Sequence, residues 1–294
     1  MAKWKFRLNA FTLHSEMSRD ALKSLLRRTL SPKAFEVARI CEWYLGSYLP
    51  RMAAAWFVTR KPEVQGFGSE PGLSRLVNEL RSLNTLAPTR MCRVMTKYAS
   101  DKGKRWHNYT PVYAVLLKEL RGKPCRIFEL GLGTDNPNLP CNMGAYGRPG
   151  ASLRGWRELL PHAQVFGADI DRAILFQEDR IETFYCDQLD QEAVRELWSQ
   201  PVLRGGADII IDDGLHSLEA NVSFFEGSIK HLNPGGLYVV EDIDTAMLGR
   251  WKDKLKVYSQ RNPTLVFALV ILPNPVNSID NNLLVVRRSP TDYN

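Results

Sequence analysis

The sequence has few of the features that mark secreted, zinc-binding or membrane-spanning proteins. Its cysteines are scattered, odd in number and without a CxxC pair; they are Cys41, Cys92, Cys125, Cys141 and Cys186. Such a set argues against a disulfide scaffold or a zinc site and fits a reducing cytosol. No long apolar core follows the basic residues at the N-terminus, so no signal peptide is expected. The most apolar early stretch, residues 52–58, is far too short to span a bilayer. We therefore expect a cytoplasmic protein.

Acidic residues are scarce in the first third of the chain. Residues 1–90 hold 15 lysines and arginines against 7 aspartates and glutamates, whereas the remainder is close to neutral. Apolar residues at helical spacing predict a basic amphipathic helix over 16–30, and a second helix, rich in aromatic residues, is predicted over 34–48. Proline and glycine in residues 59–72 indicate a linker. We therefore divide the chain into a basic helical extension, residues 1–90, and a catalytic domain, residues 91–294.

The basic extension allows several partners. An anionic membrane surface is one, and nucleic acid is disfavoured. A solvated helical surface is the plainer interpretation, and the sequence leaves a homo-oligomer open.

Residues 97–110 interleave polar, aromatic and basic side chains with no period, and a helix is predicted over 111–120. One interpretation is an ordered clamp on a substrate or cofactor, with Asp101, Lys102, His107 and Tyr109 as contacts. The alternative is a solvated turn whose histidine packs against its neighbours.

From residue 126 onward, predicted strands and helices alternate, which is typical of a parallel sheet with helices on both faces. The expected parallel strands are residues 126–130, 164–168, 183–186, 207–211 and 237–240. Residues 265–271 and 282–287 are expected to close the sheet as an antiparallel hairpin. The predicted fold is a doubly wound, mostly parallel, Rossmann-like α/β sheet.

The first of these strands runs into a glycine turn. Gly131 and Gly133 allow the backbone to approach a ligand closely, and Glu129 directs a carboxylate to the same place. The third glycine of a dinucleotide fingerprint is missing, because position 136 is asparagine. The turn therefore indicates a nucleotide-binding fold of some kind, without specifying which.

Every predicted parallel strand ends in an acid, and ligands bind beyond these ends in open α/β sheets. Asp169 is placed to accept from both ribose hydroxyls of a nucleoside, with Asp171 as the competing candidate. Asp187 is placed to accept from an exocyclic amine. Each acid alone could merely cap a helix, but the ordered set favours a nucleoside site, to which we also assign Asp212.

The last two strand ends suit a metal. Asp213, Glu241 and Asp242 offer hard oxygen ligands on adjacent strands, which favours Mg²⁺ or a similar divalent ion over zinc. His216 lies three residues beyond Asp213, where a neutral imidazole could take a proton from a polarised hydroxyl. A lone histidine is more often structural, but this one stands beside two carboxylates at a strand end.

At these residues the sequence resembles the class I methyltransferases that use S-adenosylmethionine. The similar segments are ELGLG (129–133), GADID (167–171) and NPGGLYVVED (233–242). More narrowly, DDGLH (212–216) and VVED (239–242) resemble the metal-dependent sugar O-methyltransferases of macrolide and related glycoside pathways. The likeness covers roughly residues 95–290.

The resemblance implies a cofactor, a metal and roles for individual residues. S-adenosylmethionine would bind across the first three strands, and Mg²⁺ or Mn²⁺ would bind to Asp213, Glu241 and Asp242. His216 would be the general base, and Ser152, in GASLRGW (150–156), would touch the cofactor.

The expected activity is therefore O-methylation of a sugar hydroxyl in a glycoside or polysaccharide. Two alternatives stay open at this stage. One is an NAD(P)-dependent oxidoreductase on a similar sheet, and the other is a non-catalytic binding protein that keeps the fold.

Overall fold

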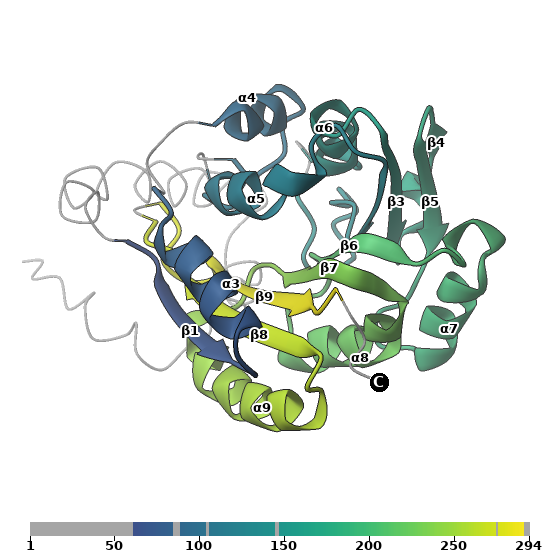
Figure 1. Cartoon of the computed structure of the whole chain (residues 1–294). Coiled ribbons are helices and arrows are strands. Elements are labelled where there is room, and N and C mark those ends of the chain that lie inside the picture. The colour runs from purple at the N-terminus through teal and green to yellow at the C-terminus, as the bar shows by residue number, and fades with distance from the viewer. Residues whose placement is uncertain (1–60, 85–88, 104–105, 145–146, 275, 291–294) are drawn as a thin grey trace, which may run out of the picture. The chain divides into compact units, whose positions relative to one another are not determined.

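The computed structural model describes residues 61–84, 89–103, 106–144, 147–274 and 276–290 (Figure 1). The helices predicted over 16–30 and 34–48, and the membrane surface suggested for them, fall outside the described residues. Among the residues that are described, no helix is both long enough and apolar enough to cross a membrane.

A nine-stranded sheet forms the centre of the described residues, in the order β1-β8-β9-β7-β6-β2-β3-β5-β4. Its parallel strands are β2 (Cys125–Leu130), β3 (Ala163–Asp169), β5 (Ile181–Tyr185), β6 (Ala207–Asp212) and β7 (Leu232–Val240). Its antiparallel strands are β1 (Glu63–Phe67), β4 (Gln177–Glu178), β8 (Leu265–Ile271) and β9 (Asn282–Arg288). The predicted fold class, including the closing hairpin β8–β9, is confirmed.

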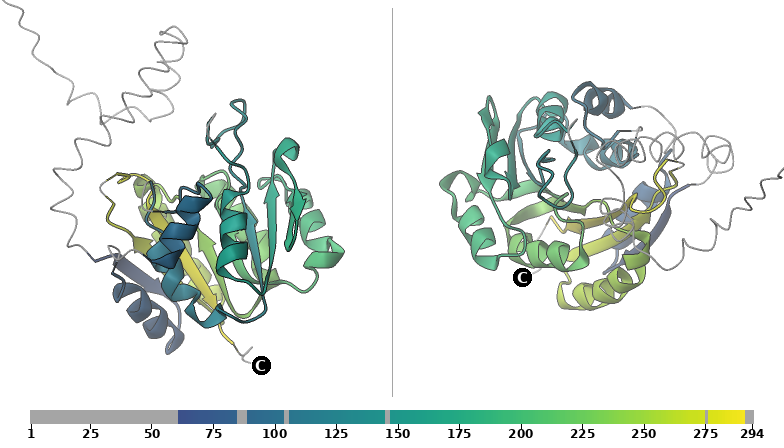
Figure 2. Two further views of the ribbon diagram at one scale, coloured as in Figure 1. Left: turned by 90° about the horizontal axis from the view of Figure 1, so that it is seen from above. Right: turned by 180° about the vertical axis from the view of Figure 1, so that it is seen from behind.

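Helices cover both faces of this sheet (Figures 1 and 2). One face carries α3 (Gly72–Arg81), α4 (Arg90–Lys97), α5 (Thr110–Leu116) and α6 (Ala151–Leu159). The other carries α7 (Gln191–Ser199), α8 (Leu218–Ser228) and α9 (Leu248–Arg261). Short 3-10 turns complete the chain: η1 (Lys118–Leu120), η2 (Arg172–Ile174), η3 (Pro201–Leu203), η4 (Ile229–His231) and η5 (Thr245–Met247).

Each face of the sheet has its own hydrophobic core. Successive side chains of a strand point to opposite faces, so Ile209 and Ile211 of β6 pack under α3–α6, whereas Ile210 packs under α7–α9. This explains why the central strands are almost continuously apolar instead of alternating. It also fixes the side of the sheet to which each residue at a strand end points.

The predicted linker over residues 59–72 is wrong where the structure describes it. Residues 63–67 form the edge strand β1, with Gln65 opposite Leu269 of β8. A Cβ at Gly66 would lie 2.6 Å from Cδ1 of Leu73 in α3, so this glycine permits close packing of helix on strand. The sheet therefore includes residues that we assigned to the extension, and the boundary at residue 90 does not separate the two.

The first helix after β2 begins at Ala151 behind Gly150, which has a left-handed conformation (φ 73°). A Cβ at position 150 would lie 2.3 Å from the Phe176 ring, so glycine is required there. Ser152 thereby lies in the first turn of α6, where its side chain points back toward β2.

Candidate active site

The glycine turn after β2 runs directly against the end of β6. Gly131 has φ 90° and Gly133 has φ 78°. A Cβ at position 131 would lie 2.0 Å from the carbonyl oxygen of Asp213, so no other residue fits without displacing that backbone. At Gly133 the nearest atom to such a Cβ would be Cγ of Met143, at 3.2 Å. The crowding at Gly131 comes from the protein itself, and Gly133 is the more open of the two positions.

Glu129 and Ser152 face each other inside the protein. Oγ of Ser152 donates to Oε1 of Glu129 at 2.5 Å, and Nε1 of Trp156 donates to Oε2 at 2.5 Å. Glu129 has no exposed surface. In the structure the two side chains bond to each other, and the expectation that they contact the cofactor stays a prediction.

Asp169 ties the end of β3 to the glycine turn. Its Oδ2 accepts from the backbone N–H of Leu132 at 2.7 Å, and its Oδ1 accepts from that of Asp171 at 2.9 Å. The competing candidate, Asp171, accepts from Oγ1 of Thr134 at 2.5 Å and from the N–H of Ala173 at 3.0 Å. Each of the two acids therefore accepts one hydrogen bond on each oxygen, and the choice of Asp169 for the ribose stays a prediction.

Asp187 is half-buried beyond β5 and accepts from the backbone N–H of Leu189 at 2.9 Å. Leu189 and Ile170, which follow closely after Asp187 and Asp169, are among the few large apolar side chains that are exposed. Apolar surface beside hydrogen-bond acceptors is typical of small-molecule sites.

Asp212 is wholly buried at the end of β6. Its Oδ1 accepts from Nε2 of Gln188 at 2.7 Å and its Oδ2 from Nδ2 of Asn221 at 3.1 Å. Burial raises the pKa of Asp212 to about 6, an effect that these hydrogen bonds only partly offset. The enclosed carboxylate links β6 to α8 through Asn221, and the cofactor contact expected at Asp212 stays a prediction.

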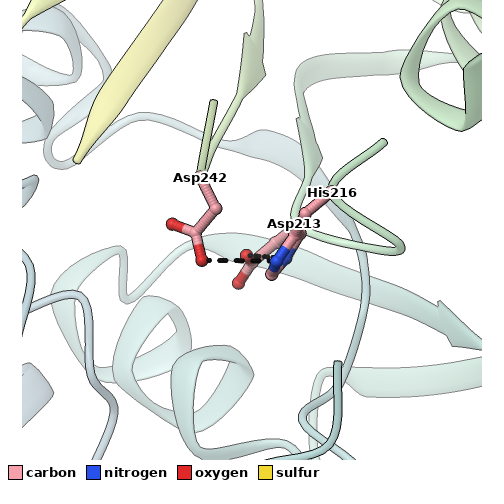
Figure 3. Close-up of side chains that lie close together, drawn as sticks. All are labelled: Asp213, His216 and Asp242. Carbon is pink, nitrogen blue, oxygen red and sulfur yellow. Dashed lines mark ion pairs between the residues drawn. The ribbon is translucent and has the colours of Figure 1, made fainter. Parts of the chain in front are cut away.

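Asp213, His216 and Asp242 come together at the ends of β6 and β7 (Figure 3). Nε2 of His216 lies 3.3 Å from Oδ1 of Asp213, and its Nδ1 lies 3.6 Å from Oδ2 of Asp242. One oxygen or nitrogen from each of the three lies within 4.8 Å of the others, a spacing that can hold a metal ion. The sequence brings these residues together as predicted, and His216 is a potential ligand as well as a potential base.

The backbone is strained at two members of this cluster. His216 has φ 57° and Asp242 has φ 54°, in the left-handed region that residues with a Cβ adopt rarely. Strained backbone of this kind is retained where the surrounding structure enforces it, often at functional sites. Both turns aim their side chains at one point.

Electrostatics within the cluster favours a charged imidazole. Burial alone would lower the pKa of His216, but the carboxylates of Asp242 and Asp213 together raise it well above its usual value. Nε2 of His216 nevertheless has no hydrogen bond of good geometry among the described residues. The same carboxylates would attract a divalent cation, and a cation bound to them would favour the neutral ring, which can accept a proton.

Glu241, predicted as a metal ligand, faces another way. Its Oε2 accepts from Nζ of Lys102 at 2.6 Å and its Oε1 from the hydroxyl of Tyr113 at 2.5 Å. Only 1% of its surface is exposed, and it is not part of the three-residue cluster found in the described chain. In the structure both oxygens of Glu241 are engaged by side chains of the domain, and its assignment as a metal ligand stays a prediction.

The segment 97–110, interpreted as a ligand clamp, contacts the site acids instead. Lys102 bonds to Asp213 and Glu241, and the hydroxyl of Tyr109 donates to Oδ1 of Asp242 at 2.7 Å. Nε2 of His107 lies 3.5 Å from the same oxygen, and its ring stacks on Tyr109 with centroids 4.6 Å apart. The segment is ordered at these residues, and it supports the acids from behind.

The sequence reasoning missed Tyr113 and Gln188. Tyr113 lies four positions after Tyr109, the residue that precedes α5, so both side chains fall on one side of the helix. Two tyrosines at that spacing, in a chain whose strands end in acids, were an available signal. Gln188 carries no comparable signal, because its partner Asp212 lies 24 positions away, at the end of β6.

No family model matches the chain. Among curated proteins, it is 33% identical over 193 residues to 8-demethyl-8-(2-methoxy-alpha-L-rhamnosyl)-tetracenomycin-C 3'-O-methyltransferase of Streptomyces olivaceus, covering 65% of this chain and 46% of that protein. It is 33% identical over 160 residues to mycinamicin VI 2''-O-methyltransferase of Micromonospora griseorubida, covering 53% of this chain and 36% of that protein. The chain thus spans less than half the length of these relatives.

Among solved structures, the chain resembles MycE methyltransferase from the mycinamycin biosynthetic pathway, determined with Mg and SAH. The TM-score is 0.54 at 25% sequence identity, covering 71% of this chain and 57% of that one. In its sheet, in the acids at its strand ends and in these relatives, the chain resembles the class I S-adenosylmethionine-dependent methyltransferases. Within that class, the chain resembles the metal-dependent sugar O-methyltransferases.

Proposed function

We propose that this chain is an O-methyltransferase that transfers a methyl group from S-adenosylmethionine to a sugar hydroxyl of a glycoside or polysaccharide, with Mg²⁺ or Mn²⁺ bound at the acceptor. The observation that carries the proposal is the position of His216 between Asp213 and Asp242 at the ends of β6 and β7. The relatives named above methylate glycosylated natural products, as their names state.

The nucleoside half of the site is formed by the turn after β2 and the acids of β3 and β5. Gly131 and Gly133 keep the turn free of side chains, and Asp169 stands beside it, held by the N–H of Leu132. Asp187 and the exposed apolar side chains of Ile170 and Leu189 lie at the next strand ends. When bound there, S-adenosylmethionine supplies an electrophilic methyl group.

The donor set beside it fits a hard divalent cation. Asp213 and Asp242 offer carboxylate oxygens, and His216 stands beside them with Nε2 3.3 Å from Oδ1 of Asp213. Magnesium and manganese prefer such oxygen ligands. When bound, a divalent cation supplies positive charge that lowers the pKa of an acceptor hydroxyl.

His216 is the residue that would take the acceptor proton. To do so at Nε2 it must be neutral, yet its two carboxylate neighbours favour the charged imidazole. A cation bound to Asp213 and Asp242 would offset the effect of these carboxylates on the pKa of His216, and so would favour the neutral ring. The geometry thus makes the base function of His216 depend on how the two carboxylates are neutralised.

The two alternatives from the sequence have no support in the relatives named above, all of which are methyltransferases by name. We also propose a cytoplasmic location, which the buried thiols of Cys125 and Cys186 suit.

The test is calorimetric titration of S-adenosylmethionine into the full chain, with and without Mg²⁺, followed by S-adenosylhomocysteine. Saturable binding of both compounds is expected. Absence of binding under either condition would contradict the proposal. With binding established, methyl transfer from labelled cofactor to a panel of rhamnosides, with free rhamnose as a control, tests the acceptor class.

A further inference from the structure

Gln188 lies between the nucleoside side of the candidate site and the turn that carries His216. It follows Asp187 directly, beyond the end of β5. Its Nε2 donates to Oδ1 of Asp212 at 2.7 Å, and its Oε1 accepts from the backbone N–H of Leu215 at 2.8 Å. Only 6% of its surface is exposed. One buried side chain thus joins the chain after β5 to the chain after β6.

The two partners match the glutamine amide at this position. A carboxylate only accepts hydrogen bonds and a backbone N–H only donates one, so the group between Asp212 and Leu215 has to offer one donor and one acceptor. A carboxylate at position 188 would face that of Asp212, and an apolar side chain would remove both bonds. The same two partners fix which end of the amide faces which strand.

The bond to Leu215 holds the turn between β6 and α8. Leu215 directly precedes His216, whose backbone is left-handed at φ 57°. A Cβ at Gly214 would lie 2.4 Å from Oε1 of Gln188, so the glutamine packs directly on the backbone of this turn. A left-handed residue with a side chain is retained where neighbouring contacts hold it. Gln188 supplies one of these contacts from outside the turn.

We propose that Gln188 is a positioning residue for methyl transfer. Its amide fixes the turn of His216 to the strand end that carries Asp187, and so keeps the base in register with the bound cofactor. The proposal rests on the proposed function, because it states how that site holds its base. Alignment of this kind matters, since a displacement of about 1 Å can cost about 10²-fold in rate.

The test compares Gln188→Met with Asn221→Leu. Each variant removes one amide donor to Asp212 at nearly constant side-chain volume, but only Gln188→Met also removes the acceptor of the Leu215 N–H. Both melting temperatures should fall by about 5 °C. In Gln188→Met, kcat should fall by about 10 to 100-fold, whereas the KM for the acceptor and the affinity for S-adenosylmethionine stay at wild-type values. Asn221→Leu should keep the wild-type kcat, and equal kcat values in the two variants would overturn the proposal.

Amide hydrogen exchange gives a measurement that does not need activity. Protein isotope-labelled at leucine reports Leu215 together with Leu132, whose N–H donates to Oδ2 of Asp169 at 2.7 Å. Relative to Leu132 of the same sample, the Leu215 amide of Gln188→Met should exchange about tenfold faster than that of the wild type, because its acceptor is lost. In Asn221→Leu this ratio should stay at the wild-type value. A wild-type ratio in Gln188→Met would overturn the proposal.

Should Gln188→Met fail to fold, a variant with reversed hydrogen bonds decides the question. In Gln188→Glu/Asp212→Asn, the new amide at position 212 can donate to one oxygen of the new carboxylate, while the other oxygen accepts from the N–H of Leu215. Asn221 can still donate to the amide oxygen at position 212. This variant should fold and keep the exchange of Leu215 at the wild-type value. Loss of folding, or rapid exchange at Leu215, would overturn the proposal.

Titration of S-adenosylmethionine into the same samples distinguishes the two levels of inference. Absence of binding in every sample, wild type included, contradicts the methyltransferase function, and the exchange of Leu215 still decides whether Gln188 holds the turn. Binding and turnover in the wild type, with equal kcat in Gln188→Met and Asn221→Leu, contradict only the role of Gln188.

Discussion

Two pairs of consecutive acids, Asp212–Asp213 and Glu241–Asp242, stand at the ends of β6 and β7. In each pair the first residue is buried and engaged by protein donors, and the second turns toward His216. Asp212 is the last residue of β6, and Asp242 stands in a left-handed turn (φ 54°) beyond β7, so the two acids of each pair have different surroundings in this structure. Acids that look alike in the sequence therefore differ in the structure. The first of each pair, the inner acid, bonds to protein donors, and the second, the outer acid, is available to a ligand.

The comparison also shows that the two inner acids are neutralised in different ways. Asp212 lies on the α7–α9 side and accepts from two neutral amides, which leaves its pKa raised to about 6. Glu241 lies on the other side and meets the ammonium of Lys102. Burial alone would lower the pKa of that lysine, but the surrounding carboxylates raise it well above its usual value. Removing an inner acid should therefore affect stability first, and removing an outer acid should affect ligand binding first.

The largest expected effect comes from the base between the outer acids. His216→Asn should lower the rate of methyl transfer by about 10² to 10⁴-fold, the contribution typical of a general base. Asparagine tolerates the left-handed backbone at this position, so folding and cofactor affinity should be unchanged. The rate is measured by steady-state kinetics with an acceptor identified from the rhamnoside panel, and the cofactor affinity by titration of S-adenosylmethionine. Retained turnover would contradict the assignment of the base.

The inner acid of β6 should show the opposite pattern. Asp212→Ala leaves the amides of Gln188 and Asn221 without an acceptor, and should lower the free energy of unfolding by about 2–4 kcal/mol. Urea denaturation measures this loss, and Mg²⁺ affinity should remain that of the wild type. A variant as stable as the wild type but with weakened metal binding would mean that Asp212 is a ligand.

A smaller effect is expected from Gly131→Ala, which presses on the backbone of the outer acid Asp213. The added Cβ would lie 2.0 Å from that carbonyl oxygen, and relief of this overlap should cost about 1–3 kcal/mol of stability. The matched control is Gly122→Ala, because Gly122 also has a positive φ of 77° but nothing within 4 Å of its Cβ. Equal losses in the two variants would show that backbone conformation, and not crowding against Asp213, sets the effect.

The sequence was sufficient to predict the parallel sheet, because apolar runs of strand length end repeatedly in acids. It also predicted the cluster of Asp213, His216 and Asp242, since strand ends of a parallel sheet meet at one edge. The division of each acid pair could not be predicted, because it depends on the register of β6 against β7 and on the helix that covers each face.

The role of Lys102 was equally hidden. Its partners lie 111 and 139 positions away, and its own segment has no periodicity that would indicate burial. The edge strand β1 was missed for a different reason. Its glycine, Gly66, suggested a linker, whereas in the structure this glycine allows α3 to pack closely on the strand.

The most direct test of the central claim is titration of Mn²⁺ into the wild type, Asp212→Asn and Asp242→Asn, three chains that differ only in which acid is neutralised. The account predicts one site of equal affinity in the wild type and in Asp212→Asn, and binding weaker by about 10 to 100-fold in Asp242→Asn. Equal affinity in all three chains, or weakening in Asp212→Asn alone, would contradict it.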